Sequence, residues 1–249
     1  MRKICTLMVA LLGWQAAFAQ FSTDKLQLRL GYNAHNAHAK HFNHLVTTFN
    51  NDRYPHIISE NLPSVNFQHG VVAGASYAFS EDLHFHAVFK SRRQYIETGY
   101  TNLDMYRGYL FRNHTLELGA AIPIGNEGRV RHFVGGGVLI GIMGVFTDWD
   151  SESGYEGSRE MLNIDHTESI GLSIHYEAQI VLHDNFHIFI RPVAQYGINS
   201  NVRNLNQFFN PVVTENGVLY PEGEGEKYDR GNLNGIGIEG GLLILLPEF

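Results

Sequence analysis

The feature that most constrains this chain is a regular alternation of apolar and polar residues over unusually long segments. The clearest segment spans residues 169–183, and a second follows the turn at Asp184-Asn185. A period of two residues is typical of a β-strand whose two faces meet different surroundings. The apolar positions of the two segments are Ile170, Leu172, Ile174, Tyr176, Ala178, Ile180 and Leu182, then Phe186, Ile188, Ile190, Ala194, Tyr196 and Ile198.

Six further segments follow the same pattern, which brings the predicted strands to eight. The connections between them alternate in length, and short turns at one end with long loops at the other are typical of an outer-membrane barrel. Glycine and apolar residues occupy both faces of 132–147, so its register stays open. The six segments begin near Leu26, Val71, Leu83, Leu116, His132 and Ile236; the short turns lie near 80–82, 125–128 and 184–185, and the longer loops span about 34–66, 98–108, 148–166 and 200–230.

Alternation alone does not say which face points inward, because a soluble lipocalin-like barrel would bury the apolar one. Strands such as 169–181 exceed the ~5–6 residues usual in soluble sheets. Aromatic residues also lie near the strand ends on the apolar face, as expected at a membrane interface. We therefore predict an all-β fold, an eight-stranded antiparallel up-and-down transmembrane β-barrel in the outer membrane. The aromatic residues are Tyr32, Phe79, Phe85, Phe186 and Tyr196.

The first nineteen residues are typical of a secretory signal. Arg2 and Lys3 precede an apolar run, and Ala17-Phe18-Ala19 offers a cleavage site before Gln20. We expect a signal peptide over 1–19 and a single barrel domain over 20–249. The one cysteine, Cys5, lies in the segment that would be removed, so no disulfide or thiolate metal site is expected. The chain has 18 Lys and Arg against 25 Asp and Glu, which argues against nucleic-acid binding.

The chain ends in Phe249 directly after the last apolar strand. A signal segment, eight alternating strands, short and long connections in turn and a terminal phenylalanine together resemble the small OmpA/OmpX-type outer-membrane β-barrel proteins. The resemblance covers the whole mature chain and concerns architecture. It implies that Phe249 helps the barrel-assembly machinery to recognise the last strand. Pro247 and Glu248 depart from that terminal pattern.

Eight strands leave an interior that side chains nearly fill. The face opposite the apolar one carries charges of both signs, and buried charges must pair because an unpaired one is costly. We predict a largely plugged lumen held by a charge network. Inward glycines such as Gly70 and Gly119 leave a narrow passive channel for small solutes as the alternative. The network comprises Arg29, Lys90, Arg92, Glu117, Glu177, Arg191 and Glu239.

Histidine recurs every third residue in the first long loop, at His35, His38, His41 and His44. On an α-helix such residues share a face, where neutral imidazoles can bind zinc or copper. No cysteine or carboxylate completes a known zinc spacing. A speculative metal site therefore stands beside an ordinary polar loop, and no cofactor is expected.

Ser173, His175 and Glu177 share one face of a strand, within reach of one another. A lipid A-modifying barrel enzyme is therefore a remote alternative. The sites of such enzymes open towards the membrane, whereas these residues are expected to face the lumen, so we expect a hydrogen-bond network and no enzyme. Two acidic stretches, within 148–156 and 222–226, lack an EF-hand pattern and are expected to be solvated loops.

These patterns favour a structural or interaction protein of the outer membrane that acts through long extracellular loops. Loops on a rigid scaffold are where binding usually resides. The expected partners are outer-membrane lipid and lipopolysaccharide, the barrel-assembly machinery and an extracellular ligand.

Overall fold

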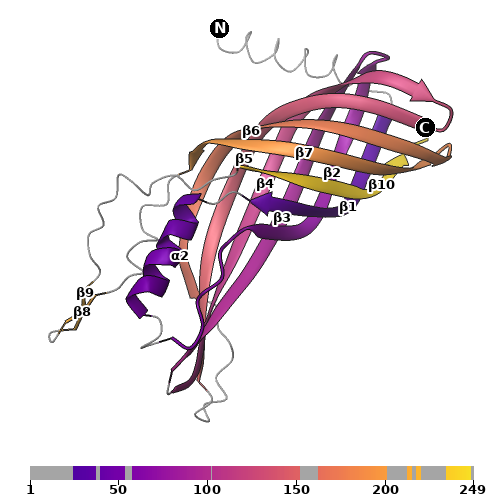
Figure 1. Ribbon diagram of the computed structural model, residues 1–249. Helices are drawn as coiled ribbons and strands as arrows, with labels where there is room; N and C mark the ends of the chain where they lie inside the picture. Colours follow the sequence, from indigo (N-terminus) through magenta and orange to yellow (C-terminus); the bar gives the residue numbers. More distant parts are fainter. Residues whose placement is uncertain are drawn as a thin grey trace, which may run out of the picture.

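The computed structural model is a closed barrel of eight antiparallel strands (Figure 1). Strand β1 pairs with β2 on one side and with β10 on the other, so the sheet has no free edge. The predicted fold is therefore confirmed. The strands are β1 (Leu26–Ala37), β2 (Phe67–Ser80), β3 (Leu83–Tyr100), β4 (Leu103–Glu127), β5 (Val130–Ser151), β6 (Leu162–His183), β7 (Phe186–Ser200) and β10 (Gly235–Leu245), in the order β1-β10-β7-β6-β5-β4-β3-β2.

Two further elements lie in the connections between barrel strands. Helix α2 (Lys40–Arg53) follows β1, and a two-stranded hairpin of β8 (Val212–Thr214) and β9 (Gly217–Leu219) lies between β7 and β10. Within the described ranges, no helix reaches the length and apolarity needed to cross a membrane. The structure describes residues 25–37, 40–53, 58–101, 103–151, 162–200, 212–214, 217–219 and 234–247.

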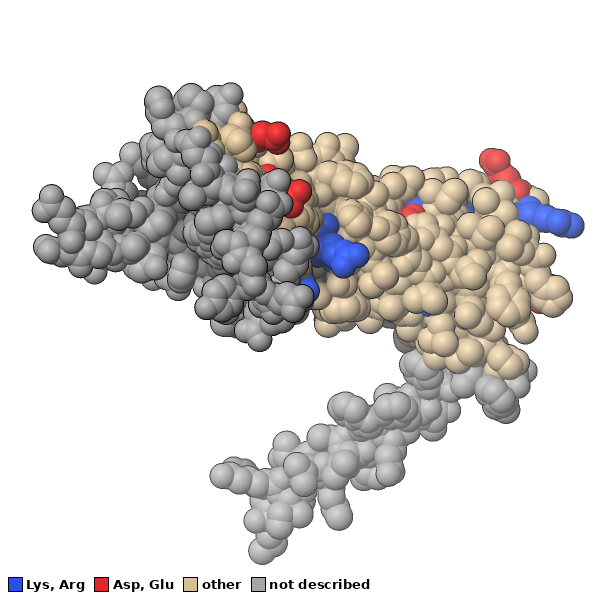
Figure 2. All heavy atoms as spheres, turned by 90° about the horizontal axis from the view of Figure 1, so that it is seen from below, with Lys and Arg blue, Asp and Glu red and all other residues tan. Residues whose placement is uncertain are grey.

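The apolar face of the barrel points outward and the charged face inward. Ile174, Ile190 and Leu118 are 69%, 43% and 46% exposed, whereas Glu177 and Arg191 are only 4% and 0% exposed. A soluble barrel would show the opposite arrangement. The outward apolar belt and the polar interior are those of a transmembrane barrel of the outer membrane. One side of the wall is accordingly a largely uncharged surface, with acidic and basic side chains gathered toward its ends (Figure 2).

The predicted interfacial aromatics are all exposed on the outer face. Phe79, Phe85 and Phe186 lie beside the short turns at 81–82 and 184–185, and the Phe79 and Phe85 rings pack edge to face at 5.8 Å. Tyr32 and Tyr196 lie toward the loop end of their strands. Aromatic rings at both ends of an apolar band match the two girdles of a membrane barrel.

The predicted second long connection is wrong. Residues 98–108 were expected to form a loop, but β3 continues to Tyr100 and β4 begins at Leu103. Beyond the membrane belt the inward positions become apolar, as at Ile96 and Phe111. Alternation therefore disappears in the sequence while the strands continue. The third connection is likewise shorter than expected, because β5 reaches Ser151 and β6 begins at Leu162.

An arginine placed on the outward face should show where the lipid lies. We expect Leu118→Arg, in the middle of the apolar run of β4, to lower the free energy of unfolding by about 2–4 kcal/mol, because the charge enters the hydrocarbon. Ile124→Arg, on the same face but near the turn, should cost about 0–1 kcal/mol. Reversible denaturant unfolding in lipid vesicles measures both. Equal costs at the two positions would contradict the membrane placement.

Candidate functional site

All seven residues of the predicted charge network lie buried in the barrel interior. They project from six different strands, and period-2 alternation sets each one inward. Arg29 comes from β1, Lys90 and Arg92 from β3, Glu117 from β4, Glu177 from β6, Arg191 from β7 and Glu239 from β10.

At the centre, four of these side chains form a closed ring of alternating charge. Lys90 Nζ lies 2.6 Å from Glu117 Oε2 and 2.5 Å from Glu239 Oε1. Arg191 Nη1 donates to Glu239 Oε2 at 3.1 Å, and Arg191 Nη2 donates to Glu117 Oε1. Each cation therefore bridges two carboxylates, and the ring links β3, β4, β7 and β10 across the lumen. Paired in this way, the charges avoid the large penalty of isolated buried ions.

A second ion pair lies on the turn side of the ring. Arg29 forms a two-pronged pair with Glu177, at 2.7 Å from Nη1 to Oε2 and 2.9 Å from Nη2 to Oε1. Gln179 Nε2 donates to Glu177 Oε1 at 2.7 Å, and the Arg29 guanidinium lies 4.5 Å from the centre of the Phe189 ring. Glu177 thus binds the edge of the planar guanidinium, and the Phe189 ring packs against its face.

Arg92 differs from the other cations in the network. Its Nη2 donates to the neutral amide oxygen of Gln195 at 2.9 Å. Arg92 therefore stays outside the ring formed by Lys90 and Arg191, and it lies two residues further toward the loop end of β3 than Lys90. The structure thus brings six of the seven predicted residues into ion pairs and places the seventh beside an amide.

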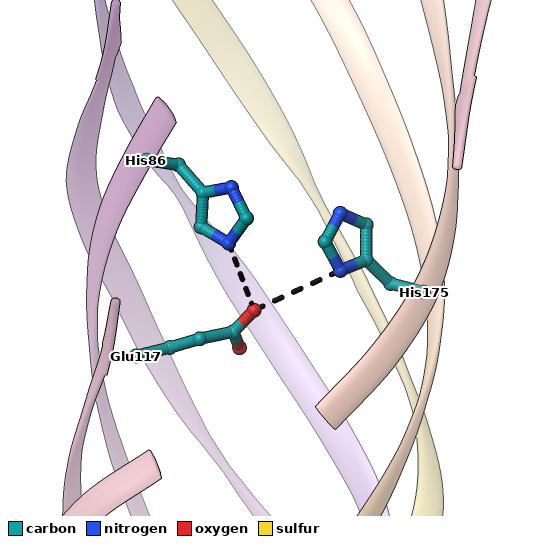
Figure 3. Close-up of side chains that lie close together, drawn as sticks. All are labelled: His86, Glu117 and His175. Carbon is teal, nitrogen blue, oxygen red and sulfur yellow. Dashed lines mark hydrogen bonds and ion pairs between the residues drawn. The ribbon is translucent and has the colours of Figure 1, made fainter. Parts of the chain in front are cut away.

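Two histidines complete the centre beside Glu117. His86 Nε2 lies 3.0 Å and His175 Nδ1 lies 3.7 Å from Glu117 Oε1 (Figure 3). Both imidazoles lie over glycines: a Cβ at Gly119 would be 2.7 Å from His86 Nε2, and one at Gly135 would be 2.7 Å from His175 Nε2. Gly119 and Gly135 thus leave space that the imidazole rings fill. The sequence had suggested that inward glycines leave gaps in the lumen.

These three residues are the candidate metal ligands of the interior, since their ligand atoms lie within 4.8 Å of one another. Arg191 Nη2, however, contacts all three: it donates to Glu117 Oε1 and to His175 Nδ1 at 2.7 Å, and it lies 3.5 Å from His86 Nε2. A guanidinium only donates, so His175 Nδ1 accepts and that ring is neutral. The Arg191 guanidinium therefore occupies the position between the three side chains that a metal ion would take.

The histidines of the first loop do not share one helix. His35 lies in β1, with its side chain buried in the barrel, whereas His41 and His44 fall within α2. His38 lies outside the described residues. A helical face that includes His35 is excluded, because the β1 strand extends through His35 to Ala37, and the speculative metal site of the other three histidines stays a prediction.

The remote catalytic alternative also finds its residues inside the barrel. Ser173 Oγ donates to the carbonyl oxygen of Gly137 at 3.4 Å. His175 contacts Arg191, and Glu177 pairs with Arg29. Among the described contacts, none joins Ser173 to His175, so the hydroxyl has no base beside it.

Above the ring, the loop end of the interior is filled by an apolar core. Val46 and Phe49 of α2 pack with residues of the segment that precedes β2 and with the inward faces of β3, β4 and β5; Figure 1 shows α2 beside these long strands. We call this assembly the cap. Its buried members are Val46, Phe49, Ile58, Leu62, Val65, Ile96, Tyr109, Phe111 and Val145.

Two asparagines of α2 hold the cap segment by its backbone. Asn43 accepts from the Val65 N–H at 2.7 Å and donates to the Val65 carbonyl at 3.0 Å. Asn50 makes the same pair of bonds with Leu62, at 2.8 and 3.0 Å. Gln94 of β3 binds the segment from the other side, by donating to the Ser64 carbonyl at 3.1 Å. The described part of the first loop, residues 40–53 and 58–66, is thus a packed structure.

Sequence reasoning missed the cap and the two histidines of the centre. Period-2 alternation places His86 and His175 on the inward face, but nothing in the sequence joins them to Glu117. The i, i+7 spacing of Asn43 and Asn50 was the one local signal for the clamps. Phe249 and the acidic residues 152–156 and 222–226 lie outside the described residues, as does the proposed signal peptide.

Replacement of Arg191 tests the role of its guanidinium. We expect Arg191→Met to lose about 3–5 kcal/mol of stability, because Lys90 becomes the only cation of the ring that pairs with Glu117 and Glu239. Added Zn²⁺ should raise the unfolding midpoint of this variant, since the two imidazoles and Glu117 become free to bind it. Denaturant unfolding followed by circular dichroism measures both effects, with Arg129→Met in the exposed turn as the control. An equal Zn²⁺ shift in the native protein would show that the guanidinium does not compete with metal.

The asparagine clamps predict a local change in hydrogen exchange. Asn50→Ala removes both bonds to Leu62, each worth about 0.5–1.5 kcal/mol, so exchange of the Leu62 amide should accelerate roughly tenfold or more. The Val65 amide, which Asn43 still holds, provides an internal reference. Unchanged exchange at Leu62 would count against the clamp.

No protein-family model and no curated protein matches the chain. Among solved structures, it is similar to Neisserial surface protein A, with 13% identity over 91% of this chain and 100% of that one and a TM-score of 0.45. It is also similar to Ail of Yersinia pestis in complex with the heparin analogue sucrose octasulfate, with 12% identity over 88% and 96% of the two chains and a TM-score of 0.40. The architecture of the small OmpA/OmpX-type barrels, expected from the sequence, is the one that the strand pairing of this chain itself displays.

Proposed function

We propose that this protein is a non-conducting scaffold of the outer membrane that presents its loop end to a partner outside the cell. The observation that carries the proposal is the ring of Lys90, Glu117, Arg191 and Glu239, which crosses the lumen in the middle of the barrel. The cap supports it by filling the loop end. A wide aqueous path has no room beside both features.

The loop end of the barrel supports the second half of the proposal. Strands β3, β4, β5 and β6 have 18, 25, 22 and 22 residues, against 12, 14, 15 and 11 in β1, β2, β7 and β10. One wall therefore rises beyond the other, and α2 packs on its inner face. Such a rigid, folded projection is suited to binding, as loops on a scaffold usually are. Outer-membrane lipid and an extracellular ligand are the partners that we propose.

A narrow channel is the second candidate, because the interior retains polar regions on both sides of the ring. On the loop side, Asn33, His35 and Gln68 are buried and have side-chain atoms without a protein partner among the described residues. On the turn side, a cavity of about 20 Å³ lies between Arg29 and His84, enough for about one water. The ring separates the two regions, so conduction would require it to open.

The absence of an enzymatic role is also part of the proposal. Its support is the engagement of Ser173, His175 and Glu177 with other groups inside the barrel. A change in lipid A mass that depends on His175 would overturn this part.

Conductance in planar bilayers tests the proposal directly. The purified, folded protein should give no single-channel steps, because the ring blocks the lumen. A variant with Lys90, Glu117, Arg191 and Glu239 all changed to serine should conduct, since four long side chains are removed while the interior stays polar. Migration on gels before and after boiling confirms that each sample is a folded barrel.

Two results would favour the channel instead. One is steady single-channel steps in the native protein, and the other is their loss in Arg92→Ala or Glu177→Ala. Arg129→Ala, in the exposed turn between β4 and β5, carries the same loss of charge outside the lumen and serves as the matched control. Steps that survive in all three variants would indicate a contaminating porin.

A further inference from the structure

The outer wall of the barrel contains a groove that the proposed function does not use. It has a volume of about 700 Å³ and lies on the outward face of the strands around β7. This volume falls within the range of small-molecule pockets, at about 300–1,000 Å³. The groove is lined almost wholly by apolar side chains, including Ile174, Pro192, Ala194 and Ile236.

The shape of the groove follows from residue size on three neighbouring strands. Pro192 and Ala194 of β7 provide a low floor. Ile174 of β6 and Ile236 of β10 flank it, and both stand out from the wall, at 69% and 66% exposed. The strand register places Ala194 directly between them, because it pairs with Ile174 on one side and Ile236 on the other.

The groove runs across the strands, and its length matches an extended hydrocarbon chain. Its outward lining residues fall into two adjacent rows of the strand register: Phe67, Asn36, Ile236, Ala194 and Ile174, then Ala34, Ile238, Pro192, Tyr176 and Val134. Five strand spacings of ~4.8 Å separate β2 from β5, or about 24 Å. Because membrane strands tilt by ~35–45°, a direction across them also runs obliquely through the hydrocarbon region.

A gap in the strand pairing coincides with this floor. The β6–β7 register joins His175 to Val193 and then Ala178 to Ile190, with no pairs at the two rows between them in the described ladder. Pro192 lies in that interval and has no backbone N–H to donate. Just inside the gap are the side chains of Glu177 and Arg191, which belong to the buried ion pairs. The β6–β7 ladder therefore lacks strand pairs at the place where the wall separates the buried charges from the lipid.

We propose that this groove holds one acyl chain of a membrane lipid, laid across β10, β7 and β6 over the gap. The occupant follows from the setting, since the groove is continuous with the apolar belt that contacts the hydrocarbon. It also follows from the lining, which offers a linear apolar slot and no charged group. A bound acyl chain shields the unpaired rows of the β6–β7 ladder from water. It also packs against Ile174 and Ile236, which stand on either side of the floor.

Lipid retention measured by native mass spectrometry tests this proposal. The full mature barrel is exchanged into mild detergent with dipalmitoyl phosphatidylethanolamine, and the lipids that stay bound are counted. We expect one lipid per native chain, and at least fivefold lower occupancy in Ala194→Phe, whose ring fills the floor. Ala87→Phe is the matched control, because Ala87 is likewise an outward-facing alanine of the wall but lies on β3, away from the groove.

Further arms identify the source and guard against misfolding. If the acyl chain is what the groove recognises, palmitic acid should bind the same site in place of the phospholipid. Its occupancy should then also fall in Ala194→Phe. If Ala194→Phe does not give the heat-shifted band of a folded barrel, the pair Ile174→Ala and Ile236→Ala removes the walls instead and should also lower retention. Equal retention in all variants would overturn the proposal. So would a native dimer that Ala194→Phe dissociates, because the occupant would then be a second copy of the chain.

Discussion

The ring of Lys90, Glu117, Arg191 and Glu239 is the interaction on which the rest of the interior depends. Its four members come from four strands, and each cation touches both carboxylates. Such charges do not stabilise a protein merely by being buried, because their desolvation offsets much of their attraction. They restrict the barrel to one arrangement instead, since a shift of any one strand would leave an unpaired ion in a cylinder surrounded by lipid. The imidazoles of His86 and His175 and the pair of Arg29 with Glu177 assemble around this centre.

The barrel changes character along its axis, and the change explains the division of roles. Within the membrane belt the charged residues lie inward, among other polar and apolar side chains, and the outward side chains are apolar. Beyond the belt the inward side of β3, β4 and β5 becomes apolar, and α2 packs against it with the help of Asn43 and Asn50. The chain thus forms a conventional hydrophobic core at the loop end, above a membrane-spanning part whose apolar face points outward. The membrane-spanning part anchors the protein in lipid, and the hydrophobic core gives the loop end a fixed shape.

Much of the fold could be predicted from the sequence, and the misses have definite causes. Period-2 alternation correctly placed Ile174 and Ile190 outside and Glu177 and Arg191 inside, because each strand shows lipid on one face and polar groups on the other. The same rule ended β3 too early and began β4 too late: Ile96 and Phe111 face inward but are apolar, so the alternation is lost where the strands leave the membrane. His35 was misplaced for a related reason, since a histidine spacing of three suggested a helix while β1 continued through it.

The sequence by itself determined which face meets lipid in every predicted strand except 132–147, since alternation defines the two faces and strand length with aromatic strand ends assigns the apolar one to the membrane. It also determined that seven charges must share the interior. Which charge meets which was decided by the tertiary structure alone. Arg29 and Glu177 are 148 residues apart, and they meet because barrel closure and strand register bring β1 and β6 to face each other across the lumen. The groove over β7 arises in the same way, because the size difference between Ala194 and its neighbours matters only once β6, β7 and β10 lie side by side.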